Sequence, residues 1–110
     1  MKSTNNLYRA LEKNELFLHY QPQVKAETGE IIGLEALLRW NNDEYGVVTP
    51  NVFIPMAEQT GMIMPIGLWV MKTACEQLKS FQKLYNKKLS MSVNLSLEQF
   101  AGKRLFHYKG

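Results

Sequence analysis

The segment "IIGLEALLRW", residues 31–40, places two opposite charges, Glu35 and Arg39, among apolar residues. In a strand the side chains alternate between two faces, so Glu35 and Arg39 would share one face while the other stays wholly apolar. A buried carboxylate needs a cation or hydrogen-bond donors. Two interpretations follow: an ion pair between Glu35 and Arg39, the commoner structural outcome, or a hard-metal ligand beside a phosphate-binding arginine.

Other polar residues stand late in neighbouring segments. Gln21 lies near the end of "LFLHYQPQV", and Asn94 lies on the polar side of the alternating segment "LSMSVNLS". Each alone is more typical of an ordinary hydrogen-bonded strand residue than of a ligand, but carboxylate and amide oxygens together suit Mg²⁺ or Mn²⁺. His19 and His107 have no metal-ligand spacing. The sequence contains no glycine-rich phosphate loop and no Ser/His/Asp arrangement.

Gln21, Glu35 and Arg39 must be positioned by two strands. Alternation predicts strands over residues 16–24 and 31–40, joined by a turn at Thr28-Gly29-Glu30. A parallel crossover needs a dozen or more residues, so this short link predicts an antiparallel hairpin. A short helix precedes the hairpin, with Leu7, Ala10 and Leu11 on one face.

The second half of the chain reads as helix, helix and strand. After a polar loop, "NNDEYGVV", the pair Thr49-Pro50 predicts a helix start and Gly61 its end. A longer helix is predicted from Pro65 to about Asn86, followed by a strand over residues 89–96. A strand, a helical crossover and a strand form a βαβ unit, so the last strand should run parallel to residues 31–40.

Composition narrows the class of protein. The 110 residues suffice for one modest domain, and 45% of them are hydrophobic. The net charge of +3 is too small and too scattered to indicate nucleic-acid binding. The longest apolar window, residues 62–71, is about half a membrane span. Cys75 is the single cysteine, so we expect a cytoplasmic chain, or the cytosolic part of a larger signalling protein.

These segments resemble the N-terminal half of the EAL-domain family, the bacterial cyclic di-GMP phosphodiesterases. Glu35-Ala36-Leu37 matches the triplet that names the family. The likeness extends, in the family's order, through "YQPQV", "TGEIIGLEALLRW", "VTPNVFIPMAEQTGMI", "GLWVMKTACEQL" and "SVNLS", from about residue 7 to residue 100. The resemblance implies an α/β fold: the N-terminal portion of an EAL-type (β/α)₈ TIM-like barrel with an antiparallel first strand, incomplete, with about three strands here.

The resemblance also implies roles for individual residues. Glu35 and Asn94 would be metal ligands for Mg²⁺ or Mn²⁺. Arg39, with Leu38 alongside, would contact the phosphate–guanine region of cyclic di-GMP, and Gln21 would line the same pocket. Family enzymes open one phosphodiester of cyclic di-GMP to give linear pGpG, in a reaction that uses two divalent ions.

The resemblance predicts a partial EAL domain over residues 1–110, with a leading helix in 1–14, family-like elements in 15–100 and a divergent tail in 101–110. Later family motifs that complete the two-metal site do not occur in these residues, so we expect this chain alone to be inactive. The alternative is a non-catalytic module that binds cyclic di-GMP or a protein in bacterial signalling. Open sheet edges would favour self-association.

Overall fold

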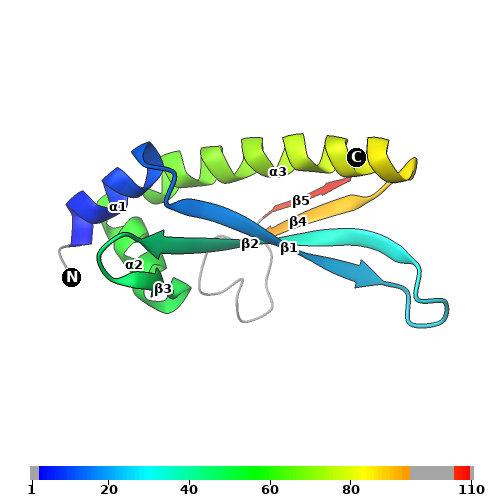
Figure 1. The fold of residues 1–110 in the computed structure, drawn as a ribbon, viewed down its shortest axis with the longest axis horizontal. Helices are drawn as coiled ribbons and strands as arrows, with labels where there is room; N and C mark the ends of the chain where they lie inside the picture. Colours follow the sequence, from blue (N-terminus) through cyan, green and yellow to red (C-terminus); the bar gives the residue numbers. More distant parts are fainter. Residues whose placement is uncertain (1–2, 95–105, 110) are drawn as a thin grey trace.

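The computed structural model describes residues 3–94 and 106–109, with side chains over residues 7–93. Within these residues the elements, in chain order, are α1 (Ser3–Glu12), β1 (Leu16–Val24), β2 (Ile31–Asn42), β3 (Gly46–Val48), α2 (Pro50–Thr60), α3 (Ile63–Tyr85), β4 (Ser90–Asn94) and β5 (Phe106–Lys109). The long helix α3 runs along one side of the sheet (Figure 1).

The sheet has the strand order β1-β2-β4-β5, and β3 pairs with the end of β2. β1 and β2 are antiparallel, with Leu16 opposite Trp40 and Gln21 opposite Glu35. β4 runs parallel to β2, with Ser92 opposite Glu35. The predicted hairpin and the predicted parallel βαβ unit are therefore both confirmed.

The apolar face of the sheet packs beneath α3. Four alternating residues of β2 are buried, and so is a stripe along α3; these residues are Leu34, Ala36, Leu38 and Trp40 on the strand, and Ile66, Val70, Ala74 and Leu78 on the helix. Tyr20 of β1 joins this layer, where its ring meets Phe81 edge-on at 5.7 Å between centroids. Burial raises the pKa of the Tyr20 phenol above its usual value of 10.0. The stripe ends before Tyr85, which is 64% exposed.

The helix ends follow the local signals. Pro50 is the first residue of α2, and Gly61 ends that helix in the left-handed region at φ 79°. Asn86 ends α3 in the same region, and its backbone N–H donates to Gln82 O. The helix α3 begins at Ile63, two residues before Pro65. Proline is tolerated in a first turn because the N–H groups there have no partner within the helix.

Two strands differ from the sequence-based prediction. The loop "NNDEYGVV" contains β3, and β2 extends to Asn42 to pair with it. The Asn42 side chain is buried, and its Oδ1 accepts hydrogen bonds from the backbone N–H groups of Glu44 and Tyr45, both at 2.9 Å, which fixes the turn between the strands. β5 pairs antiparallel with β4, so the described residues form five strands where about three were expected.

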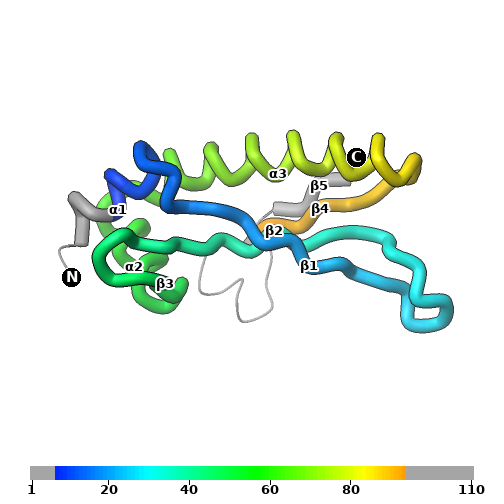
Figure 2. Tube along the Cα trace, in the orientation of Figure 1, coloured from blue at the N-terminus to red at the C-terminus, as the bar shows by residue number. Residues whose placement is uncertain are grey.

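The molecule is elongated, with extents of 46 × 26 × 23 Å. Figure 2 shows α1 and α2 at one end of the molecule and the turn between β1 and β2 at the other. The core at the first end includes Trp40, whose ring meets Phe53 of α2 edge-on at 5.8 Å. No helix in the described part of the chain is long and apolar enough to cross a membrane.

Candidate functional site

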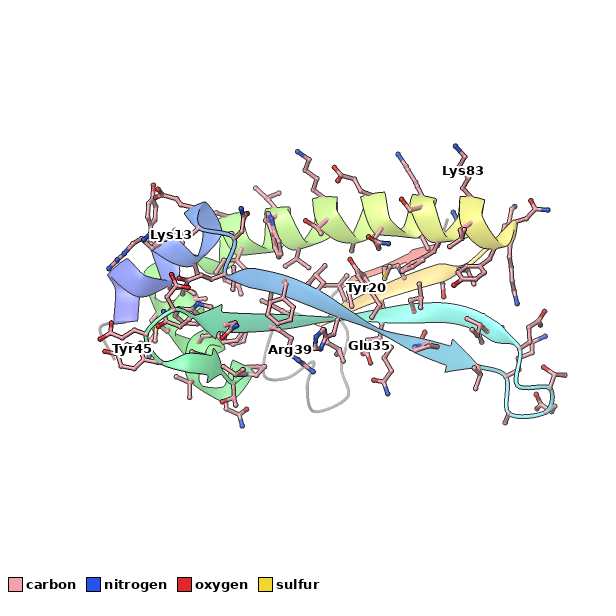
Figure 3. All side chains as sticks on the ribbon, in the orientation of Figure 1. Lys13, Tyr20, Glu35, Arg39, Tyr45 and Lys83 are labelled. Atoms are coloured by element: carbon pink, nitrogen blue, oxygen red, sulfur yellow. The ribbon has the colours of Figure 1, made fainter. Side chains whose placement is uncertain are left out.

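The polar face of the sheet carries the predicted site residues Gln21, Glu35 and Arg39 (Figure 3). Register places Gln21, Glu35 and Ser92 in one row across β1, β2 and β4. Directly opposed residues share a face, so these three side chains lie on the side of the sheet that α3 leaves uncovered. Figure 3 shows Glu35 and Arg39 pointing away from α3, whereas Tyr20 lies toward it. The alternation in "IIGLEALLRW" therefore separates the charged side chains from the core, as predicted.

Arg39 does not pair with Glu35. Its Nη1 donates to the carbonyl oxygen of Leu38 at 3.1 Å. Among residues 7–93, the ion pair is instead between Lys87 Nζ and Glu30 Oε2, at 3.2 Å and near the hairpin turn. The ion-pair interpretation of Glu35 and Arg39 is therefore wrong. Glu35 and Arg39 are four residues apart, which separates their Cα atoms by about 13 Å along the strand, and here the arginine folds back onto the backbone next to it.

Asn94 is placed by its backbone. Its Cα lies opposite Leu37 in the β2–β4 ladder, so Asn94 is the diagonal neighbour of Glu35. Diagonal neighbours in a sheet lie about 7–8 Å apart, a separation that two side chains can span by meeting at one cation. The Asn94 side chain lies outside the described residues. No group of three His, Cys, Asp or Glu side chains gathers to hold a metal ion in the described part.

The oxygen donors on this face would satisfy part of the coordination shell of a hard divalent cation. Glu35 offers a half-buried carboxylate on a face that opens away from the core. Mg²⁺ is commonly held by one or two carboxylates while it keeps several waters, so Glu35 with an amide oxygen would make one side of such a shell. The predicted ligands Glu35 and Asn94 come together on adjacent strands, and they provide fewer donors than a pair of ions needs.

Leu38 is placed differently from the other predicted substrate contacts. Its side chain is 0% exposed and packs in the core on the opposite face from Arg39. Only the Leu38 backbone borders the polar face, through the carbonyl that accepts the Arg39 hydrogen bond. Gln21, by contrast, is exposed and lies opposite Glu35. Any role for Leu38 in binding would therefore be carried by its backbone.

An open pocket of about 410 Å³ lies beside Arg39. It is lined by Leu37 and Arg39 of β2 and by residues 47–51, which join β3 to the start of α2. The N-terminus of a helix favours anions, and arginine matches phosphate geometry. The polar composition of residues 41–48 predicts a loop, so this wall of the pocket was not predicted. The pair Val47-Val48 after Gly46 was the available strand signal.

The spacing of β2 and β4 depends on Gly33. A Cβ at this position would collide with Ser90 Oγ and would lie 3.1 Å from both Ser90 O and Gln23 Oε1. The Ser90 hydroxyl donates to Ile32 O at 3.5 Å across the same pair of strands. Glycine at position 33 thus allows the close approach of the strands that carry Glu35 and Asn94.

Ser92 is a further polar residue of this face, beyond the predicted site residues. It is 0% exposed and lies between Glu35 on β2 and the backbone of His107 on β5. Its parity in "LSMSVNLS" already placed it on the polar face, but only the register of the parallel ladder sets it opposite Glu35.

Comparison with known proteins agrees with this geometry. The model of the EAL domain family matches residues 4–108. MucR of Pseudomonas aeruginosa, named a bifunctional diguanylate cyclase/cyclic di-GMP phosphodiesterase, is 46% identical over 97 residues. The cyclic di-GMP phosphodiesterase PdeR of Escherichia coli is 39% identical over 101 residues. A solved structure of the phosphodiesterase PaMucR in complex with c-di-GMP superimposes with a TM-score of 0.78 at 46% identity.

The coverage of these matches is unequal. The comparison covers 88% of this chain but 14% of MucR, and 92% of this chain but 15% of PdeR. It covers 89% of this chain and 40% of the solved PaMucR chain. The α/β fold described above thus corresponds to part of an EAL-type TIM-like barrel, and this chain belongs to the EAL domain family.

Proposed function

We propose that the polar face of the sheet binds one part of cyclic di-GMP together with Mg²⁺ or Mn²⁺. The observation that carries this proposal is the row Gln21–Glu35–Ser92, with Arg39 on the same face, in a chain 46% identical to a protein solved as a c-di-GMP complex. Carboxylate oxygen suits the metal, and the guanidinium suits a phosphodiester.

Each side chain has a separate task in this proposal. Arg39 would leave its hydrogen bond to Leu38 O and bind a phosphate oxygen in the pocket beside α2. Glu35 and Asn94 would hold the metal, which when bound neutralises phosphate charge and lowers the pKa of a bound water. Gln21 offers an amide opposite Glu35 that can donate to or accept from the nucleotide.

We further propose that the 110-residue chain by itself binds without hydrolysing. The predicted ligands are Glu35 and Asn94, whereas the family reaction uses two ions, which need a larger set of donors. Binding without turnover would make the chain a cyclic di-GMP-binding module, the second function considered from the sequence. A cytoplasmic location and self-association through the sheet edges belong to the same proposal.

Calorimetric titration of the chain with cyclic di-GMP tests this function. We expect binding in the presence of Mg²⁺ and its loss in EDTA. Glu35→Gln should reduce the metal-dependent affinity at least about ten-fold, because a charge-assisted contact contributes roughly 1.5–3 kcal/mol. Chromatography of the same mixtures for pGpG separates binding from hydrolysis.

Glu27→Gln is the matched control, because it makes the same chemical change at an exposed residue of the hairpin turn. It should leave binding unchanged. If Glu35→Gln binds as tightly as the unmodified chain with Mg²⁺ present, Glu35 is not a metal ligand. If pGpG accumulates, the chain is an enzyme by itself and the binding-only proposal is wrong.

A further inference from the structure

Glu15, between α1 and β1, connects the leading helix to the end of β2. Its Oε1 accepts a hydrogen bond from Trp40 Nε1 at 2.9 Å and a longer one from Asn42 Nδ2 at 3.4 Å. The backbone of Glu15 is also held on both sides, because its N–H donates to Ala10 O and its C=O accepts from the N–H of Asn41, both at 3.0 Å. Glu15 is therefore a fixed acceptor, and none of these bonds involves a residue proposed to touch the nucleotide.

One connection from Glu15 to the open pocket of about 410 Å³ passes through Asn42. The Asn42 side chain is 6% exposed, and its Oδ1 accepts from the backbone N–H groups of residues 44 and 45, both at 2.9 Å. Side-chain amides commonly fix turns in this way. The turn leads directly into β3, whose residues 47 and 48 form one part of the pocket wall. The contact of Asn42 with Glu15 thus bears on the position of β3.

A second connection passes through Trp40. Its ring is fully buried and meets Phe53 of α2 edge-on at 5.8 Å between centroids. Phe53 belongs to the first turn of α2, since its backbone N–H donates to Thr49 O at 3.2 Å. Residues 49–51 of this turn form the rest of the same pocket wall. An indole whose N–H is bonded to Glu15 keeps one orientation against α2, so the same carboxylate bears on both parts of the wall.

The position of this wall matters for Arg39, which lines the same pocket from β2. In the proposed function, Arg39 leaves Leu38 O and binds a phosphate oxygen in this pocket. The phosphate would lie between the guanidinium and residues 47–51, so a shift of the wall would change how well the group fits. Binding sites depend on neighbouring side chains and hydrogen bonds that hold the contacting groups in place.

We propose that Glu15 is a positioning residue for nucleotide binding, which acts through Asn42 and Trp40 to fix residues 47–51 opposite Arg39. This role rests on the function proposed above. It has two consequences: loss of these contacts loosens the wall even without nucleotide, and it weakens binding although every residue proposed to touch the nucleotide is unchanged. The first consequence is measured without nucleotide, so its outcome is separate from that of the proposed function.

Hydrogen exchange of the chain without nucleotide measures the loosening of the wall. In Glu15→Leu and in Asn42→Ala, the amides of residues 44–53 should exchange several-fold faster than in the unmodified chain, because the bonds that fix them are lost. Residues 70–84 of α3 are the internal control and should keep their rates. Glu15→Gln retains an acceptor oxygen and should leave residues 44–53 unchanged. Unaltered exchange at residues 44–53 in both disrupting variants, or equal acceleration in α3, would overturn the proposal.

Calorimetric titration with cyclic di-GMP and Mg²⁺ measures the effect on binding. Glu15→Leu and Asn42→Ala should raise the Kd at least about five-fold, whereas Glu15→Gln should bind like the unmodified chain. Leu78→Ala is the control for lost stability, because Leu78 is buried on α3 and is not among the residues that line this pocket. It should lower the urea midpoint and leave the Kd unchanged.

Two results of the titration would count against the proposal. If residues 44–53 loosen while the Kd stays the same, the wall takes no part in binding and Glu15 serves stability alone. If Leu78→Ala weakens binding as much as Glu15→Leu, the effect follows from stability and not from position. Absence of binding by the unmodified chain would overturn the proposed function itself, and the exchange rates would then decide whether Glu15 fixes residues 47–51.

Discussion

The two faces of β2 differ sharply in burial although their residues alternate along one strand. Leu34, Ala36, Leu38 and Trp40 lie against the helices and are at most 8% exposed. Glu35, Leu37 and Arg39 remain half-buried on the other side. The apolar face carries the packing that holds the fold, and the polar face carries the groups proposed to bind a ligand. One strand therefore serves both purposes without placing a charge in the core.

This division implies that stability and binding respond to different substitutions. Changes on the apolar face should lower the free energy of unfolding, because they remove contacts with α2 and α3. Changes on the polar face should leave the fold largely intact and alter binding. Neighbouring positions in the same strand provide matched pairs for testing this difference.

Leu38→Ala should have the largest effect on stability. Its side chain is fully buried, so its truncation should lower the free energy of unfolding by about 2–5 kcal/mol. Leu37→Ala, the same change at the next residue on the polar face, should cost about 1 kcal/mol or less. Urea unfolding followed by circular dichroism measures both values. Equal losses would show that the polar face is also part of the packed core.

Glu15→Leu tests the polar contact that anchors the apolar face. The Glu15 carboxylate accepts a hydrogen bond from the buried Trp40 indole Nε1 at 2.9 Å. Without an acceptor, the indole N–H loses its partner in the core, at a cost of about 1–3 kcal/mol. Glu15→Gln keeps an acceptor oxygen and should recover most of this loss. If Glu15→Leu and Glu15→Gln lower the free energy of unfolding in urea by the same amount, the contact contributes through the charge of Glu15 and not through the hydrogen bond.

Tyr20→Phe should produce a smaller effect that depends on pH. Burial raises the pKa of Tyr20, so the folded chain holds the phenol proton more tightly than the unfolded chain. That stabilisation is complete below the unfolded pKa of 10.0 and is lost as pH rises through the folded value. The stability of the unmodified chain should therefore fall more steeply above about pH 10 than that of Tyr20→Phe. Urea titrations at rising pH measure the slopes, with Tyr85→Phe as the exposed control.

Glu30→Gln should have the smallest effect. The ion pair between Glu30 and Lys87 joins groups that are 52% and 33% exposed, and such pairs contribute about 0–1 kcal/mol. Added salt should remove most of the difference between this variant and the unmodified chain. A loss of stability comparable to that of Leu38→Ala would show that this exposed ion pair contributes as much to the free energy of unfolding as a buried core side chain.

Local patterns predicted much of the fold. Alternation in "IIGLEALLRW" separated core from polar face, and Thr49-Pro50 and Gly61 marked both ends of α2. The short link at Gly29 predicted the hairpin. The prediction failed for two short strands, each of which depends on a partner strand. β3 forms because the extended end of β2 offers it a partner across a tight turn, and β5 pairs with β4, from which it is separated by residues 95–105, outside the described part.

The residue types of the candidate site could be predicted from the sequence, but the arrangement of their side chains could not. Residue types and family likeness pointed to Gln21, Glu35 and Arg39, and parity along one strand put Glu35 and Arg39 on the same face; that Gln21 lies opposite Glu35 follows only from the observed register. No local rule could show that Arg39 would bond to Leu38 O in preference to Glu35, or that Ser92 would stand opposite Glu35. Both depend on strand register and on side-chain conformations, which only the assembled sheet determines.

Gly33 shows how a residue with no proposed ligand contact can control the positions of the residues proposed to bind. It lies opposite Ser90, and a methyl group there would press on the Ser90 carbonyl and force β4 away from β2. A displacement of a few tenths of an ångström would be carried along β4 to Asn94. Among variants that no longer bind the nucleotide, a Gly33 substitution would therefore resemble the loss of a proposed metal ligand, although Glu35 and Asn94 would both still be present.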